Sequence, residues 1–592
     1  MADQNNADEM VFTLIPQPGI KRDGTYLEGE QCSDGQWVRF QRGKAKKMGG
    51  YRRITDQLTG PVRKFILWTR KDLNSCISFS SSKVETLLVD NNLVGNAIND
   101  RTPSSGFTSN TNNLWTADTQ YDDAVGTTGT IVVAHCNQSL ANIDDDTASK
   151  PYWALASSAS SLFATITDAP AVSGGVFSLA PYTVVYGSDG FVGWSDANQP
   201  QVWSGSTVPG DAGSDRVTGA KIVCGLPLRA GNLAALLWSL DSVIRMDYIG
   251  GAAIFKFATV STQSSILAQN SVIEYDGSYF WIGVDRFMYF DSAVHELPND
   301  MNQNWFFDNL NFEHRQKIWA TKVPRFGEII WHYPRGTATE CNATIVFNVR
   351  LKTWYDYSIS RSAGFYSQIR HYPVWVGSEA EPNSVTAMAA TWTRVTVVAT
   401  VTLVAHGLVT GDTINVSVSS DTSAIALGSY TVTRLTADTF SFACLDAGGA
   451  SGTLTYDKTT PTYGLYQHEF GYNAVVGDVE SAIQSYYVTQ NFGYLTGGVQ
   501  DSPQGPNRWT RLTRVEPDFV QVGDMTCTVI GYEFAQAPAE PETSYNFGVT
   551  TGKIDMREQR RHILLKFESN TLDGFYEAGK VIIHTELGDN RS

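Results

Sequence analysis

Apolar and aromatic residues recur in short runs along this chain, and the clearest set lies between Ser271 and Asp291. Three runs rich in aromatic and β-branched residues are separated there by Asp276-Gly277 and by a second turn at Gly283. Asp-Gly suits the positive φ angles of a tight hairpin, so the stretch predicts an antiparallel three-stranded meander. A lone meander cannot bury both of its faces, and we therefore expect similar meanders to pack beside it.

Weaker copies of this pattern occur elsewhere. Asp189-Gly190 separates two apolar runs, and the stretch from Cys341 to Tyr357 predicts two strands joined by a turn. Tryptophan at or near the end of a repeated hairpin is common in β-propeller blades. The pattern therefore predicts an all-β fold with a β-propeller-like core of antiparallel meanders. An irregular β-sandwich with ordinary hairpins is the alternative.

A different pattern begins near Thr391. Valine and threonine alternate from there to Tyr456, with turn residues about every ten positions, which is typical of a small β-sandwich or barrel. The flanking phrases VWVGSE and GLYQHEFGY would adjoin without it, so we interpret the stretch as an inserted module. The predicted regions are an N-terminal arm with a basic hairpin segment (1–60), the propeller-like core (61–385), the inserted small β module (386–460), and final propeller strands with a C-terminal β-sheet region (461–592).

Composition agrees with an all-β protein. The chain has 592 residues, of which 51 are glycine and 12% are aromatic, as expected for strands separated by glycine turns. Its formal net charge of −16 argues against general binding to phosphate backbones. The seven cysteines are scattered without a CxxC pair, which indicates reduced thiols of a protein made in a cytoplasm. No run of about 18 apolar residues occurs, so no membrane span is predicted.

The acidic balance reverses in one segment. Between Lys21 and Arg53, nine basic residues stand against four acidic ones, a local charge of about +5. This asymmetry indicates contact with an acidic partner. The KAKK run lacks the stacking aromatic residues of a single-strand binding platform, so a protein partner is favoured over nucleic acid. The alternative is a solvated loop whose lysines keep a turn soluble.

We find no motif that indicates catalysis. The GxSxG, HExxH and phosphate-loop patterns do not occur. The acidic run Asp144 to Asp146 lacks the spaced ligands and the downstream glutamate of a calcium loop. We therefore predict a protein that is not an enzyme, with no catalytic, cofactor-binding or metal-binding residue and no cofactor.

The opening phrase PGIKRDGTYLEGEQCSDGQWVRFQRGKAKKMGGYRRI resembles the start of tail nozzle, tail hub or packaged-DNA-stabilisation proteins of short-tailed, double-stranded DNA bacteriophages. The shared features are the PG…RDG turn, the DGQWVRFQRG hairpin and the GGY ending. The resemblance continues in patches through LLWSLDSVIRMDYIGGAAIFKFATV and the stretch from Ser271 to Asp291. It ends at RRHILLKFESNTLDGFYEAGKVIIHTELGDNR.

The resemblance implies a structural protein of the virion tail, assembled in the host cytoplasm. It implies a closed ring, a hexamer, that docks on the portal-adaptor ring, carries tail fibres or spikes, retains packaged double-stranded DNA and conducts it during ejection. Acidic loops lining such a tube would repel the DNA backbone. The residues expected to dock on the adaptor are Arg39, Arg42, Lys44, Lys46, Lys47, Arg52 and Arg53. The alternative function is a β-propeller protein that binds or cleaves glycans on the host surface.

Overall fold

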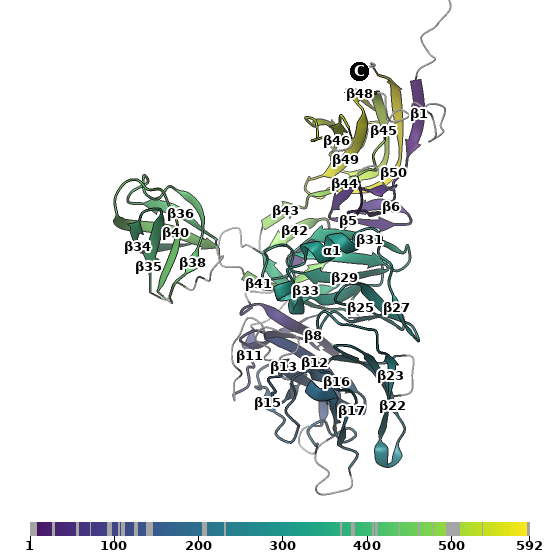
Figure 1. The fold of residues 1–592 in the computed structure, drawn as a ribbon, viewed down its shortest axis with the longest axis vertical. Coiled ribbons are helices and arrows are strands. Elements are labelled where there is room, and N and C mark those ends of the chain that lie inside the picture. Colours follow the sequence, from purple (N-terminus) through teal and green to yellow (C-terminus); the bar gives the residue numbers. More distant parts are fainter. Residues whose placement is uncertain are drawn as a thin grey trace, which may run out of the picture. The chain divides into compact units, whose positions relative to one another are not determined.

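The computed structural model has two compact units, one formed by Met1–Gly377 with Tyr463–Ser592 and the other by Ser378–Thr462. Strands make up 57% of the chain and helices 4%, which confirms the predicted all-β class (Figure 1). The structure describes residues 9–588 except for 26–29, 55–57, 71–72, 91–97, 105–106, 108–112, 124–127, 138–145, 204–209, 230–232, 368–369, 380–384, 405, 407, 409–412, 437, 460–461, 477–478, 493–508 and 535–536.

Six four-stranded antiparallel sheets follow one another along the first unit, and we name them the first to the sixth sheet. In each, the strands pair in chain order, so the first strand forms one edge. The first three contain β8 (Val62–Arg70), β9 (Leu73–Ser80), β10 (Val84–Val89), β11 (Asn99–Asp100); β12 (Leu114–Asp122), β13 (Gly129–Asn137), β14 (Tyr152–Leu155), β15 (Ala164–Thr165); and β16 (Gly175–Leu179), β17 (Tyr182–Tyr186), β18 (Phe191–Trp194), β19 (Gly213–Arg216). The next three contain β20 (Ile222–Pro227), β21 (Ala234–Ser239), β22 (Val243–Tyr248), β23 (Phe255–Ser261); β24 (Ile273–Tyr275), β25 (Ser278–Ile282), β26 (Phe287–Phe290), β27 (Val294–Glu296); and β28 (Trp319–Val323), β29 (Glu328–Tyr333), β30 (Ala343–Asn348), β31 (Thr353–Ser358).

The meander predicted between Ser271 and Asp291 is confirmed as the first three strands of the fifth sheet. Asp276 and Gly277 make its first turn with φ angles of 51° and 85°, the two positive values that a tight hairpin requires. The sequence pattern does not reveal the fourth strand, β27, because this strand holds one apolar residue followed by two polar ones.

A seventh sheet joins segments from distant parts of the chain. Its order is β32-β33-β41-β7-β42-β43. The N-terminal strand β7 lies between β41 and β42, antiparallel to the first and parallel to the second. This sheet is therefore completed by residues from both ends of the unit. Its strands are β32 (Ala363–Phe365), β33 (Val374–Glu379), β41 (Thr462–His468), β7 (Tyr51–Arg53), β42 (Asn473–Val476) and β43 (Val479–Ala482).

Two glycines allow β7 to enter this sheet. A side chain at Gly49 would overlap Glu469, and one at Gly50 would overlap the backbone of Asn473. The N–H of Gly50 donates a hydrogen bond of 2.8 Å to the carbonyl of Gly471. The close approach of the two backbones requires residues without a Cβ, which gives the GGY phrase a structural reason.

Hydrophobic clusters join each of the seven sheets to the next one along the chain. The series returns to its start, because Val374 and Val376 of the seventh sheet pack with Phe65 and Leu67 of the first. Large aromatic side chains fill these contacts, and each buried tryptophan removes a large apolar area from water. The tryptophans that are fully buried in them are Trp115, Trp238, Trp281, Trp331, Trp354 and Trp375.

The two ends of the chain also build a pair of sheets together. The large terminal sheet contains β1 (Glu9–Leu14), β5 (Val38–Gln41), β6 (Lys44–Lys47), β45 (Thr510–Val522), β48 (Ile554–Arg560) and β50 (Phe575–Leu587). The small terminal sheet contains β4 (Asp34–Gln36), β44 (Ser485–Val488), β46 (Met525–Tyr532), β47 (Thr543–Phe547) and β49 (His562–Ser569). N-terminal strands thus pair with C-terminal ones, although residues 1–60 and 461–592 were predicted to form separate regions.

The remaining elements of the first unit are short. They are the parallel pair β2 (Gln17–Ile20) and β3 (Gln31–Cys32), the helix α1 (Gln303–Asn309), and the 3₁₀ turns Ser188–Gly190, Gly251–Ala253 and Phe312–Lys317. None of the helices in the described ranges is long and apolar enough to cross a membrane.

The second unit is one seven-stranded sheet with its own core, in which Trp392, Ile414, Phe440 and Tyr456 are buried. The strands that flank it in the chain, β33 and β41, are neighbours in the seventh sheet. An insertion at this point therefore leaves the pairing of the parent sheet intact. Its strands are β34 (Val385–Val395), β35 (Val398–Thr402), β36 (Thr413–Ser419), β37 (Gly428–Thr431), β38 (Thr433–Arg434), β39 (Thr439–Ala443) and β40 (Ser451–Thr459).

Candidate functional site

The predicted docking residues lie on the β5–β6 hairpin and on β7. The hairpin turns at Arg42-Gly43, with φ angles of 54° and 77°, as a two-residue turn requires. Arg42 and Lys44 are exposed at this turn. The ammonium of Lys46 lies 3.6 Å from the carboxylate of Glu577 in β50. Lys47 is 1% exposed, and burial lowers the pKa of its ammonium to about 8.

Arg39 is buried inside the protein and is not accessible at its surface. Its side chain is 2% exposed, and its Nε donates a hydrogen bond of 2.8 Å to Glu328 Oε1. Its Nη1 donates another of 2.7 Å to Glu469 Oε2, and the guanidinium lies 3.7 Å from the ring centre of Phe326. Burial raises the pKa of Glu328, and the charge of Arg39 opposes that rise. Arg39 therefore ties the terminal hairpin to the sixth sheet and to the loop after β41.

Arg52 also makes internal contacts. Its Nε donates a hydrogen bond of 2.7 Å to Gln467 Oε1, and its guanidinium lies 4.3 Å from the ring centre of Phe470. The side chain of Arg53 lies against Gly464 of β41. Both contacts help to hold β7 in the seventh sheet.

The RDG turn of the opening phrase is anchored in the same way. Arg22 donates from Nε to Asp356 Oδ1 at 3.0 Å. Asp23 accepts hydrogen bonds of 2.8 Å from the backbone N–H groups of Asn304 and Trp305, at the start of α1. The carboxylate thus satisfies two N–H groups that have no partner within the helix.

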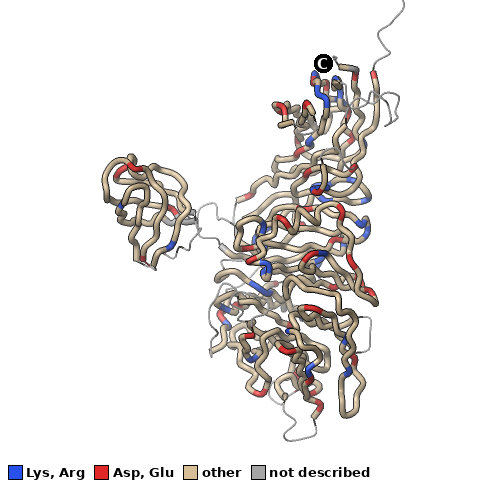
Figure 2. Tube along the Cα trace, in the orientation of Figure 1, with Lys and Arg blue, Asp and Glu red and all other residues tan. Residues whose placement is uncertain are grey.

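These contacts assign most of the basic segment to the fold. Figure 2 shows basic and acidic residues interspersed along the trace of this unit. The adaptor-docking role stays a prediction, and Arg42 and Lys44 are the members of the set that are exposed. Sequence reasoning missed Glu328 and Glu469 as partners of Arg39, because they lie 289 and 430 positions away along the chain.

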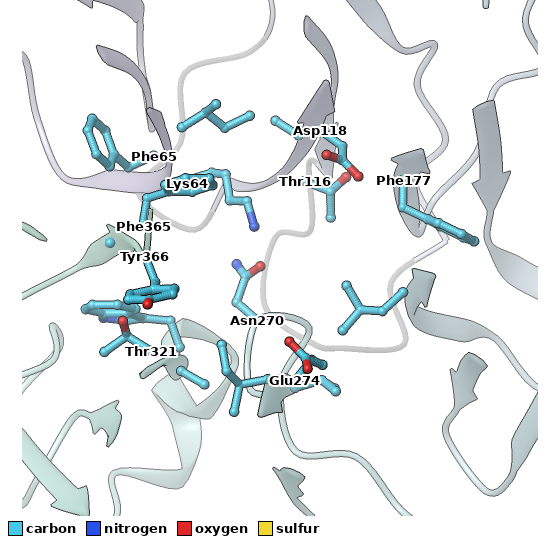
Figure 3. A pocket seen from close by; sticks show the side chains of 18 of the residues that line it. Lys64, Phe65, Thr116, Asp118, Phe177, Asn270, Glu274, Thr321, Phe365 and Tyr366 are labelled. Atoms are coloured by element: carbon cyan, nitrogen blue, oxygen red, sulfur yellow. The ribbon is translucent and has the colours of Figure 1, made fainter. Parts of the chain in front are cut away.

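The first strands of the seven sheets surround one pocket of about 610 Å³ (Figure 3). Around it, β8 lies beside β12, β12 beside β16, β16 beside β20, β24 beside β28, β28 beside β32, and β32 beside β8. Tyr279 links the fourth and fifth sheets, since its hydroxyl donates to the carbonyl of Pro227 at 2.6 Å and accepts from the N–H of Arg229 at 3.1 Å. No sequence motif marks the pocket, because each strand contributes only a few of its residues.

One group of charges in the pocket is mutually paired. The ammonium of Lys322 lies 2.7 Å from Glu274 Oε2, and Nε of Arg229 lies 3.6 Å from the same oxygen. Burial alone would raise the pKa of Glu274, but hydrogen bonds from Lys322 and from the N–H of Gly277 lower it overall. The charge of the Glu274 carboxylate is therefore already neutralised by Lys322 and Arg229.

A second group in the pocket is open. Asp118 accepts hydrogen bonds from the N–H groups of Ser178 (3.0 Å) and Thr119 (2.8 Å), and burial raises the pKa of its carboxyl. Lys64 makes no side-chain hydrogen bond or ion pair with any residue that the structure describes. Figure 3 shows its ammonium directed into the pocket, with the amide of Asn270 opposite. Burial lowers the pKa of Lys64, and the charge of Asp118 acts against this.

The described residues contain no group of three histidine, cysteine, aspartate or glutamate side chains placed to hold a metal ion. Of the acidic run noted in the sequence, Asp144 and Asp145 lie outside the described residues. Asp146 is exposed and accepts a hydrogen bond from Ser188.

No family model matches the chain, and no curated protein is similar to it. Among solved structures, a protein of Bacteroides fragilis described as exported is 8% identical, with 55% of this chain and 83% of that one covered at a TM-score of 0.25. A glycoside hydrolase is 8% identical, with 89% and 99% covered at a TM-score of 0.24. A bifunctional GH43-CE protein of Bacteroides eggerthii is 8% identical, with 92% and 64% covered at 0.21. At these TM-scores the similarity supports no conclusion about function.

Proposed function

We propose that this protein is a structural subunit of a short phage tail, in which copies form a ring-shaped nozzle that docks on the adaptor and conducts DNA. The observation that carries the proposal is the meeting of the two resembling phrases. Strands β4, β5 and β6 come from the opening phrase, and β49 and β50 from the closing one. They share the two terminal sheets although they stand at opposite ends of the chain. Two stretches of resemblance that fold into the same sheets support a relationship to the tail proteins better than two stretches that lie apart in the structure.

We further propose that the core of the first unit is a seven-bladed β-propeller. The support is the closed series of hydrophobic clusters and the arrangement of the seven first strands around one pocket. Strand β7 would close the propeller, because it precedes the first sheet in the chain and pairs with strands β41 and β42 of the seventh. Closing a series of sheets leaves only short edges exposed, which disfavours uncontrolled strand pairing.

Such a subunit suits a conduit for DNA. A ring needs one interface repeated head to tail, which a rigid body can present without rearrangement. The net charge of −16 would repel the phosphate backbone and keep the genome from adhering to the wall. Arg42 and Lys44, at the exposed hairpin turn, would contact an acidic adaptor ring.

Native mass measurement tests the ring. Six copies of the 65.0 kDa chain would give a particle of about 390 kDa. Images of that particle should show six-fold symmetry around an open channel. A chain that stays at 65.0 kDa over a wide range of concentration and hydrolyses a surface glycan would replace the nozzle with the glycan-acting alternative.

A charge-reversal variant tests docking separately. The double change Arg42→Glu and Lys44→Glu should leave ring formation intact and abolish attachment to phage particles that lack their nozzle. The matched control is Lys83→Glu, which alters a partly exposed lysine on the first sheet. Attachment that persists in the double variant would remove the docking claim.

A further inference from the structure

The geometry points to a binding site for a small acidic saccharide, a sugar that carries a carboxylate, in the pocket at the centre of the seven sheets. This inference rests on the pocket alone and does not depend on ring formation. The cavity of about 610 Å³ lies within the range of roughly 300–1,000 Å³ that is usual for small-molecule sites. It is lined by aromatic side chains with a few convergent polar groups, the common composition of such sites.

Charge selects an anion. Lys64, which forms no ion pair with a described residue, shares the pocket with the nearby carboxylate Asp118, while Glu274 is already paired with Lys322 and Arg229. Three cations against two carboxylates leave the pocket at +1, in a chain whose net charge is −16. The guanidinium of Arg63, on the wall, is occupied by Glu340 and does not alter this balance. The charge of Asp118 acts on Lys64 without a hydrogen bond between them, so a ligand carboxylate could take up a direct, charge-assisted hydrogen bond from the ammonium.

The other groups suit a hydroxylated ring. Figure 3 places the Asn270 amide opposite Lys64 and the Asp118 carboxylate to one side, so that donors and acceptors face a shared space. An amide both donates and accepts, which matches sugar hydroxyl groups. The ring of Tyr366, 5.6 Å from the ammonium of Lys322, forms part of the same wall and offers a flat face to the apolar side of a sugar.

Titration calorimetry with the full chain tests the site. The probes are glucuronate and galacturonate, with glucose and galactose as their uncharged counterparts and glutamate as a carboxylate that is not a sugar. We expect the uronates to bind at least about ten-fold more tightly than the matched neutral sugars, the size expected for one charge-assisted hydrogen bond. Equal affinity for charged and neutral sugars, tighter binding of glutamate, or no binding of any probe would overturn the inference.

Two variants locate the effect. Lys64→Met, which keeps the length of the side chain, should weaken uronate binding about ten-fold and leave the weak binding of neutral sugars unchanged. Asn270→Ala should weaken both classes, because hydroxyl groups are common to them. Lys83→Met, outside the pocket, is the control. Uronate binding that is unchanged in Lys64→Met would contradict the site, and circular dichroism shows whether each variant is folded.

Binding should also depend on pH. The carboxylate requires the protonated form of Lys64, whose pKa burial lowers in the free pocket. Affinity for uronates should therefore decrease as the pH is raised above that pKa, whereas affinity for neutral sugars should not. Lys64→Arg stays charged over the same pH range and should keep its uronate affinity, so equal pH dependence of that variant and the parent chain would oppose a role for this lysine.

Discussion

Arg39 and Lys64 are both basic and both lie inside the first unit, yet their surroundings differ. Arg39 has hydrogen bonds to two carboxylates, at 2.8 Å and 2.7 Å, and is 2% exposed. Lys64 faces a cavity and makes no ion pair with any described residue. The comparison teaches that a cation inside a protein can serve the fold or remain available to a ligand. The presence of a counter-charge within hydrogen-bond distance distinguishes the two cases.

The largest effect should come from removing the paired cation. Arg39→Met leaves Glu328 and Glu469 without their partner in a buried site, and we expect a loss of about 3–5 kcal/mol in the free energy of unfolding. Denaturant-induced unfolding followed by tryptophan fluorescence measures it. Arg42→Met, on the same hairpin but exposed, should change stability by less than about 0.5 kcal/mol. Similar values for the two variants would contradict the structural role of Arg39.

Acidification should produce the next largest effect, through a buried base that forms no ion pair with the residues the structure describes. His135 is fully buried, and burial lowers the pKa of its imidazole from 6.5 to about 4. As the pH falls, the unfolded chain binds a proton before the folded chain does. The contribution of the neutral imidazole to the free energy of unfolding is therefore complete above pH 6.5 and is lost as the pH falls toward 4. Over that interval the loss is about 3 kcal/mol. A His135→Gln variant should show a correspondingly flatter dependence of stability on pH, and equal slopes would refute this account.

A smaller effect should follow from the anchored turn. Asp23→Ala removes two hydrogen bonds of 2.8 Å to the start of α1, and we expect a cost of about 1 kcal/mol. Asp23→Asn keeps an acceptor oxygen and should recover much of that loss. Hydrogen exchange at the N–H groups of Asn304 and Trp305 gives a local measurement, because both should exchange faster in the alanine variant alone.

The smallest change in stability should come from the unpaired cation. Lys64→Met removes a partly buried charge that has no hydrogen bond or ion pair with a described residue, so the free energy of unfolding should stay within about 1 kcal/mol of that of the parent chain. The same variant should weaken uronate binding about ten-fold. Destabilisation as large as that of Arg39→Met would mean that Lys64 also serves the fold, and the contrast between the two residues would disappear.

Local sequence patterns revealed much of the fold. The Asp276-Gly277 turn and the aromatic runs on either side of it each depend on neighbours a few positions apart. The sequence did not predict the fourth strand of the fifth sheet, because apolar and polar residues do not alternate in Val294–Glu296. The sequence showed the positive charge of the basic segment. It did not show the hydrogen bonds and ion pairs that these residues make within the fold, because a run of lysines and arginines does not indicate which residues will pair with it.

The sequence by itself determined the all-β class, the hairpin turns and the interruption of the parent fold between β33 and β41, because backbone preference and side-chain alternation act over short distances. The tertiary structure alone decided which cations are neutralised, how β7 completes the seventh sheet and that Lys64 and Asn270 face one cavity. Those outcomes depend on contacts between residues hundreds of positions apart, such as Arg39 with Glu469, 430 positions away. Only folding brings such residues together.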